Sequence, residues 1–246
     1  MYAECEKPQI VASILYYDEV YDSCCAEKVL HCFEANNMFF PDRINLGRLT
    51  KNRFKEYTPA MRELFIRAYS EKGVLALTWE HKDNRMHKDY FMGHWTLTFY
   101  KNKQVVETPV FRPWNVLSLY VTYDWIEDKN NCDRFLRCVR QLIPILHPFC
   151  VEIDDVSNLV SIHRTGKRES LLKPRHLHKP NICWGNYWGS DVCNRVDITR
   201  LSNLSLNTFE EIEGGVFFTL SNNVLQFNTS ECVKNRKRIK KAFFAK

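Results

Sequence analysis

Three runs of alternating apolar and polar residues follow one another between positions 75 and 125 of this 246-residue chain. In the first run Leu75, Leu77 and Trp79 alternate with smaller residues, and the same period of two recurs over 95–100 and 117–125. Successive side chains of a strand point to opposite faces, so each run has one apolar and one polar face. The three runs therefore predict an antiparallel meander with one face buried and the other exposed to water.

Helical periodicity flanks these strands. Residues 132–143 carry the strongest amphipathic stripe, and apolar residues also recur at helical spacing over 23–36. A third helix is predicted over 58–73, because it begins with Thr-Pro and ends at Gly. We expect Pro144 to kink or end the helix that precedes it.

This order of helices and strands, without a Gly-x-Gly-x-x-Gly motif or a regular βαβ alternation, predicts an α+β fold. We expect a mostly antiparallel sheet with helices packed on one side. No linker or internal repeat divides the chain, so we predict a single domain over 1–246 that ends in a basic helix at about 231–246. No apolar run approaches the roughly 20 residues that span a bilayer, and we therefore predict no membrane partner.

Charge is distributed unevenly along the chain, although 35 Lys and Arg against 29 Asp and Glu give a net charge of only +6. The segment 234–246 holds seven bases and no acid, and without it the net charge is −1. Leaving out 164–179 as well, which holds six bases and one acid, brings the net charge to −6. The sequence thus predicts an acidic body with two basic segments rather than a basic surface over the whole fold.

Ten cysteines are present, but a chain that can bury a real core does not need the disulfide framework of small secreted domains. The first residues have neither the basic nor the apolar region of a signal peptide. We therefore predict a cytoplasmic protein whose thiols are mostly small buried hydrophobes.

Residues with catalytic or metal-binding chemistry form no completed pattern. The histidines fall into two groups without the close ligand pairing of a structural zinc site: His81, His87 and His94, and then His176 and His178 in a basic loop predicted over 161–180. Asp154 and Asp155 would point to opposite faces of a strand. We predict no metal, no cofactor and no enzymatic activity, with an enzyme whose histidines and Asp154-Asp155 converge as an alternative.

Residues 182–189 form the most unusual local sequence, Ile-Cys-Trp-Gly-Asn-Tyr-Trp-Gly. Two glycines among three aromatic residues predict a sharp, irregular turn in which Asn186 bonds the backbone. Large rings on such a turn either lock it into the core or present a rigid patch to a partner. The residues alone favour the structural role slightly.

About 25 residues further on, Gly214-Gly215-Val216 precedes a short predicted strand. Together with Trp-Gly-Asn-Tyr-aromatic-Gly, this resembles the bacterial immunity proteins of polymorphic toxin systems, and among them the immunity protein 52 type. The resemblance is specific over about 182–220, and upstream the order of helices and strands agrees. Trp188 stands where a smaller side chain is expected, and the basic tail is longer than the family pattern.

The resemblance implies an intracellular protein that binds and blocks a cognate toxin domain, often a nuclease, and performs no reaction of its own. An acidic body would suit a basic nuclease surface through electrostatic steering. The residues assigned to toxin binding or to the motif are Trp184, Gly185, Asn186, Tyr187, Trp188, Gly189, Asp191, Glu210, Glu211 and Glu213, with Gly214 and Gly215 as structural residues. The three aromatic residues would act as anchors if they are exposed.

A nucleic-acid-associated protein that uses 164–179 and 234–246 is the alternative function. Its affinity would fall by roughly 10³ between 50 and 200 mM salt if six phosphates were neutralised. The tail is better explained as a terminal helix whose bases oppose the partial negative charge at its C-terminus. Aromatic residues for base stacking are absent from the tail until Phe243, which makes nucleic acid the less favoured partner.

Overall fold

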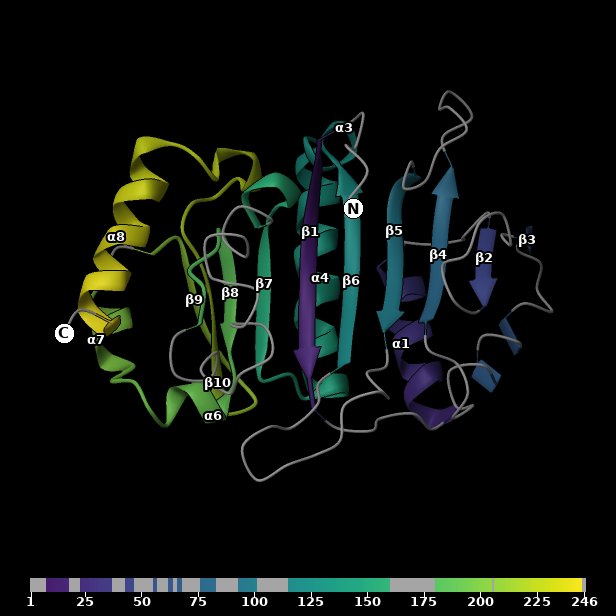
Figure 1. The fold of residues 1–246 in the computed structure, drawn as a ribbon, viewed down its shortest axis with the longest axis horizontal. Coiled ribbons are helices and arrows are strands. Elements are labelled where there is room, and N and C mark those ends of the chain that lie inside the picture. Colours follow the sequence, from purple (N-terminus) through teal and green to yellow (C-terminus); the bar gives the residue numbers. More distant parts are fainter. Residues whose placement is uncertain are drawn as a thin grey trace.

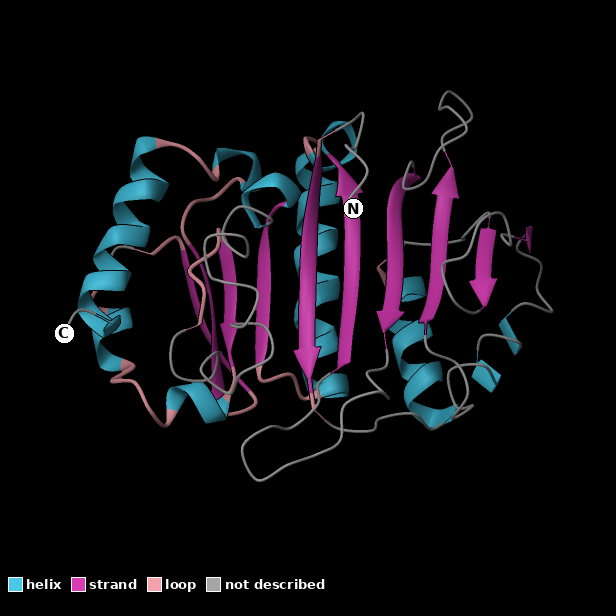
Figure 2. Ribbon diagram, in the orientation of Figure 1, coloured by secondary structure: helices cyan, strands magenta, loops and turns pink. Residues whose placement is uncertain are grey.

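The structure, a computed structural model, describes residues 8–17, 23–36, 43–46, 55–56, 62–63, 66–67, 76–82, 93–100, 115–159, 180–204 and 206–244. Ten strands in these ranges form one sheet in the order β3-β2-β4-β5-β6-β1-β7-β8-β10-β9. Every neighbouring pair in this sheet is antiparallel. Figure 1 shows the N-terminal strand β1 between teal strands from the middle of the chain, and Figure 2 shows helices flanking the sheet.

The strands are β1 (Gln9–Tyr16), β2 (Arg43–Leu46), β3 (Lys55–Glu56), β4 (Ala76–Lys82), β5 (Gly93–Tyr100), β6 (Asn115–Thr122), β7 (Cys150–Asp155), β8 (Gly185–Trp188), β9 (Thr208–Ile212) and β10 (Gly215–Thr219). The longer helices are α1 (Ser23–Ala35), α4 (Lys129–Leu146) and α8 (Ser230–Phe244). Short turns of helix are α3 (Tyr123–Ile126), α6 (Ser190–Cys193), α7 (Thr199–Ser202) and the 3₁₀ segment η3 (Val224–Gln226).

The two faces of the sheet are covered by different helices. On one face Ile10, Ala12 and Ile14 of β1 belong to the main core, together with the apolar stripes of α1 and α4. On the second face Val11 packs with Leu159 and Cys183. Asp154 lies opposite Val11 in the β1–β7 register and therefore shares this second face, where it contacts Arg236 of α8.

The prediction of an α+β fold with a mostly antiparallel sheet is confirmed, and α1 and α4 pack together on one side of it (Figure 1). Helix α8 adds a cover on the second face. It corresponds to the basic helix expected at about 231–246. None of the helices among the described residues has the length and apolar character needed to cross a bilayer.

Two local predictions differ from the structure. The strand expected over 117–125 ends at Thr122, where α3 begins, and the Tyr123 hydroxyl donates to Asp155 Oδ2 at 2.8 Å. Pro144 lies inside α4, which continues to Leu146. A proline removes one backbone hydrogen bond, and we attribute the continuation to the burial of Ile143 and Leu146 on the core face, which offsets that loss.

Candidate functional site

The aromatic segment forms a strand rather than the irregular turn that its glycines predict. Residues 185–188 are β8, which pairs with β7 on one side and β10 on the other. Gly185 is required there by a close approach, because a Cβ atom would lie 3.1 Å from the Ile153 side chain. Gly189 is equally constrained, since its Cβ would lie 2.7 Å from the Pro148 carbonyl oxygen. These glycines permit tight strand packing and do not mark a turn.

All six residues of the motif are buried. Trp184, Tyr187 and Trp188 are exposed by 1%, 2% and 0%, so the condition of exposure for interface anchors is not met. Trp188 packs edge-on against Phe218 and Phe243, with ring centroids 5.1 and 5.6 Å away. The motif thus joins the sheet to α8 from inside the core.

Asn186 supplies the polar partner that the backbone needs at the start of this strand. Its Oδ1 accepts from the Cys183 amide at 2.8 Å, and its Nδ2 donates to the Cys183 carbonyl at 2.9 Å. The side chain therefore supplies hydrogen bonds that a neighbouring strand would otherwise make. This agrees with the prediction that Asn186 bonds the backbone. Both hydrogen bonds are buried, and their loss would destabilise the fold because unpaired backbone groups cost free energy away from water.

Replacing Asn186 with Ala is expected to lower the free energy of unfolding by roughly 2 kcal/mol or more, because it leaves the Cys183 amide and carbonyl without partners. Chemical denaturation followed by circular dichroism measures this loss. Asn222→Ala on an exposed position is the matched control and should change stability by less than about 0.5 kcal/mol. Equal stability of the two variants would contradict the assigned role.

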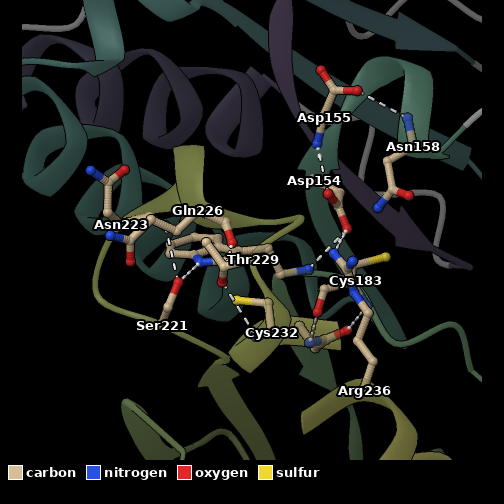
Figure 3. Close-up of polar contacts among 12 residues, drawn as sticks. Asp154, Asp155, Asn158, Cys183, Ser221, Asn223, Gln226, Thr229, Cys232 and Arg236 are labelled. Carbon is tan, nitrogen blue, oxygen red and sulfur yellow. Dashed lines mark hydrogen bonds and ion pairs between the residues drawn. The ribbon is translucent and has the colours of Figure 1, made fainter. Parts of the chain in front are cut away.

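A buried ion pair lies beside the motif on the second face (Figure 3). Arg236 Nη2 of α8 donates to Asp154 Oδ2 at 2.6 Å, and the backbone amide of Trp184 donates to the same oxygen at 3.0 Å. The Asp154 side chain is completely buried, and that of Arg236 is 12% exposed. Burial raises the pKa of the Asp154 carboxyl, and the neighbouring guanidinium lowers it by less than burial raises it.

Sequence reasoning did not find this pair, because Arg236 was counted with the exposed bases of the tail. The position of Arg236 along the predicted helix is the signal that could have identified the pair. Cys232, Asn235 and Ile239 of α8 are buried, and Arg236 is one turn from Cys232 on the same side of the helix. The ion pair fastens helix α8 to strand β7.

A series of hydrogen bonds holds Trp184, at the other end of the motif. The Trp184 indole Nε1 donates to Ser221 Oγ at 2.8 Å, and that hydroxyl donates to the Asn223 carbonyl at 3.0 Å (Figure 3). Asn223 Oδ1 in turn accepts from the Leu225 amide at the start of η3. The contacts around Trp184 thus fix the approach of the chain to α8, and their role is structural.

The predicted acidic residues are exposed, on the β9–β10 hairpin and on α6, and Glu210 and Glu211, as neighbours in a strand, point to opposite faces of the sheet. Glu213 and Gly214 form a two-residue turn between β9 and β10, with φ of 49° and 72°, as type I′ hairpins require. Glu210, Glu211 and Glu213 are exposed on this hairpin. We call these three residues, with exposed Asp191 of α6, the acidic hairpin surface.

Contacts on both sides fix the position of this surface. Ser190, the neighbour of Asp191, lies next to the turn, because a Cβ at Gly214 would be 3.9 Å from its Cβ. Glu210 Oε2 accepts from Arg140 Nη1 of α4 at 3.1 Å. At Gly215 a Cβ would overlap the Trp188 carbonyl oxygen, so Gly215 has the predicted structural role. Strand β9 is the terminal strand of the sheet among the described residues.

Of the predicted histidines, the two that the structure describes, His81 and His94, do not share a site with Asp154-Asp155 along the sheet. His81 and His94 lie in β4 and β5, whereas the two aspartates lie in β7. Three inter-strand steps from β5 to β7 correspond to roughly 14 Å. Within the ranges that the structure describes, no three His, Cys, Asp or Glu side chains could hold a metal ion. His87, His176, His178 and the basic segment 164–179 lie outside these ranges.

The thiols are mostly buried, as predicted. Cys24 is exposed, whereas eight other described cysteines are buried. Burial raises the pKa of Cys150 and Cys183 well above the usual thiol value and that of Cys193 to about 11. These thiols are not poised as nucleophiles at neutral pH.

The fold is similar to a solved structure described as "Pseudomonas aeruginosa T6SS protein PA0821". The alignment covers 96% of this chain and 72% of the other, with a TM-score of 0.65 and 13% sequence identity. At this level of identity the likeness concerns the fold. No family model matches the chain, and no curated protein matches it.

Proposed function

We propose that this protein is a non-enzymatic immunity protein that binds and neutralises a cognate toxin domain. The observation that carries the proposal is the likeness in fold, over 96% of the chain, to a protein described as belonging to a T6SS. A T6SS-related fold is compatible with a role in toxin immunity. The resemblance of residues 182–220 to immunity proteins of the immunity protein 52 type supports the same class.

The acidic hairpin surface is the proposed contact site for the toxin. Its carboxylates are exposed, and the backbone that carries the three glutamates is fixed by the two-residue turn and by the pairing of β9 with β10. Charges on a rigid element lose little entropy on binding, and they steer a partner of opposite charge. A basic toxin surface, such as that of a nuclease, suits this site. The buried aromatic residues of β8 contribute by fixing the sheet behind it.

The test uses the purified toxin domain encoded beside the gene of this chain. We expect a stable complex on size-exclusion chromatography and loss of toxin activity at a molar excess of this protein. Full toxin activity under these conditions would contradict the proposal, since an immunity protein must act on its cognate toxin without further components.

Neutralising the hairpin charges in the triple variant Glu210→Gln, Glu211→Gln, Glu213→Gln is expected to weaken toxin binding at least tenfold, mainly through slower association. Surface plasmon resonance at two salt concentrations measures the effect. The melting temperature should change by no more than a few degrees, because the Glu210–Arg140 pair is exposed and contributes little to stability.

The matched control removes charges of the opposite sign from α8, with Lys237→Gln, Lys240→Gln and Lys241→Gln. These lysines are exposed on the outer side of the helix. We expect unchanged toxin affinity. Equal losses in the two triple variants would show a general effect of surface charge and would remove the hairpin from the proposed interface.

A nucleic-acid partner is the second candidate, favoured by the exposed bases of α8, namely Lys234, Lys237, Arg238, Lys240 and Lys241. If these five bases contacted phosphates, affinity would fall roughly 500-fold between 50 and 200 mM salt. The triple lysine variant tests both the toxin hypothesis and the nucleic-acid hypothesis. Loss of DNA or RNA binding in that variant, with no effect of the hairpin variant, would favour nucleic acid over the toxin.

A further inference from the structure

Two cysteines meet where α1 packs against α4. Cys32 of α1 and Cys138 of α4 have their sulfur atoms 3.8 Å apart, although 106 positions separate them in the sequence. Cys32 Sγ also lies 3.5 Å from the Cys138 carbonyl oxygen. This is close contact between two free thiols, and a disulfide bond requires the two sulfurs to approach to about 2.05 Å and the bridge to adopt its preferred dihedral angle.

The two thiols differ in how accessible they are to a reagent in solution. Cys138 is completely buried, whereas Cys32 is 6% exposed. Cys32 Sγ lies 3.7 Å from the side-chain oxygen of Gln141, an exposed residue of α4. Asn36 Nδ2 donates to that oxygen at 2.6 Å and holds Gln141 beside the pair. Cys32 therefore lies near the outer margin of the helix interface, with Cys138 behind it.

We propose that Cys32 and Cys138 form a reversible disulfide that ties α1 to α4 when the protein meets a small disulfide oxidant such as oxidised glutathione. The Cys32 thiolate attacks one sulfur of the oxidant, which forms a mixed disulfide and releases one glutathione thiolate. Burial raises the pKa of Cys138 well above its usual value, so its thiolate forms mainly at alkaline pH; it then attacks Cys32 Sγ and releases the second glutathione as a thiolate. Two thiols lose two protons and two electrons, and one glutathione disulfide becomes two glutathione thiols.

The cross-link acts on the stability of the helix layer. It would close a loop of about 106 residues, and long closed loops restrict the unfolded chain most. The acidic hairpin surface lies on β9, the β9–β10 turn and α6, neither cysteine belongs to these segments, and the contact described between this surface and α4 is the Arg140–Glu210 pair on the surface. The proposal thus stands independently of the proposed toxin binding, and we expect the oxidised protein to retain its binding partner.

Oxidised glutathione added to the full-length protein tests the proposal. After unfolding and alkylation of the remaining thiols, peptide mass spectrometry should show a cross-link between the Cys32 and Cys138 peptides. The melting temperature should rise by roughly 5 to 10 °C and return on reduction. Cys24→Ser, which removes an exposed thiol, should leave both results unchanged.

Cys138→Ala separates the two chemical steps. It should abolish the cross-link and leave Cys32 as a mixed disulfide with glutathione. Two results would overturn the proposal in the wild-type protein, whether or not the variant folds. One is glutathione bound to Cys24 while Cys32 and Cys138 both remain free. The other is a cross-link at a different pair, such as Cys150 and Cys183, in its place.

Discussion

Replacing Arg236 with Met is expected to lower the free energy of unfolding by about 3 to 5 kcal/mol, because it leaves the buried Asp154 carboxylate without its charged partner. Urea denaturation at pH 8 measures this loss. The double variant Arg236→Met, Asp154→Asn removes both charges and keeps an oxygen that can accept from the Trp184 amide. It should recover a large part of the stability, which an additive effect of the two substitutions would contradict.

The Arg236→Met variant should also show a distinct pH dependence. Burial already raises the pKa of Asp154, and Arg236 opposes this increase, so removing the arginine raises the folded-state pKa further. The folded variant then binds a proton more readily than the unfolded chain, whose aspartate titrates near pH 3.9. The deficit is therefore present at neutral pH and declines as the pH falls through the raised pKa. A deficit that grows on acidification would contradict this assignment.

The second large effect is expected for Trp188→Ala, which should lower the free energy of unfolding by about 3 to 5 kcal/mol. The indole is fully buried and fills the space between Phe218 of β10 and Phe243 of α8. Calorimetry or chemical denaturation measures the change. Trp188→Phe keeps an aromatic ring and should cost less, roughly 1 to 2 kcal/mol. Val233→Ala on the exposed side of α8 serves as the near-neutral control.

This second result also distinguishes the two roles considered for the motif. A core role predicts that Trp188→Ala weakens partner binding only to the extent that it unfolds the protein. The charge variants of the acidic hairpin surface should do the opposite and weaken binding without unfolding. If the Trp188→Ala protein stays folded but loses toxin affinity, the motif has a role in the interface rather than only in the core.

Local periodicity was sufficient to predict most of the secondary structure. The strands β4, β5 and β6 and the helices α1 and α4 lie where their apolar patterns place them, and the α+β class follows from their order. The helix expected over 58–73 falls largely outside the described residues, and the residues described within that range, 62–63 and 66–67, are helical. These elements are local, so a window of 10 to 20 residues contains the information they need.

The errors concern residues whose conformation depends on distant contacts. Glycines in 185–189 suggest a turn by local rules, but Gly185 is needed because Ile153 of the next strand approaches it closely. Arg236 looks like an exposed tail residue until its partner Asp154, 82 positions away, is known. The acidic hairpin was found because charge and the Gly-Gly turn are local features. The binding of a toxin to these carboxylates stays a prediction.

The central position of β1 has a consequence for how the chain folds. Residues 9–16 leave the ribosome before both of their partners, because they pair with 115–122 on one side and 150–155 on the other. Bringing such distant segments together costs loop-closure entropy before any contact is gained, which slows folding. Strand β1 must therefore wait while the roughly 100 residues between it and β6 are synthesised, which favours assistance by a chaperone.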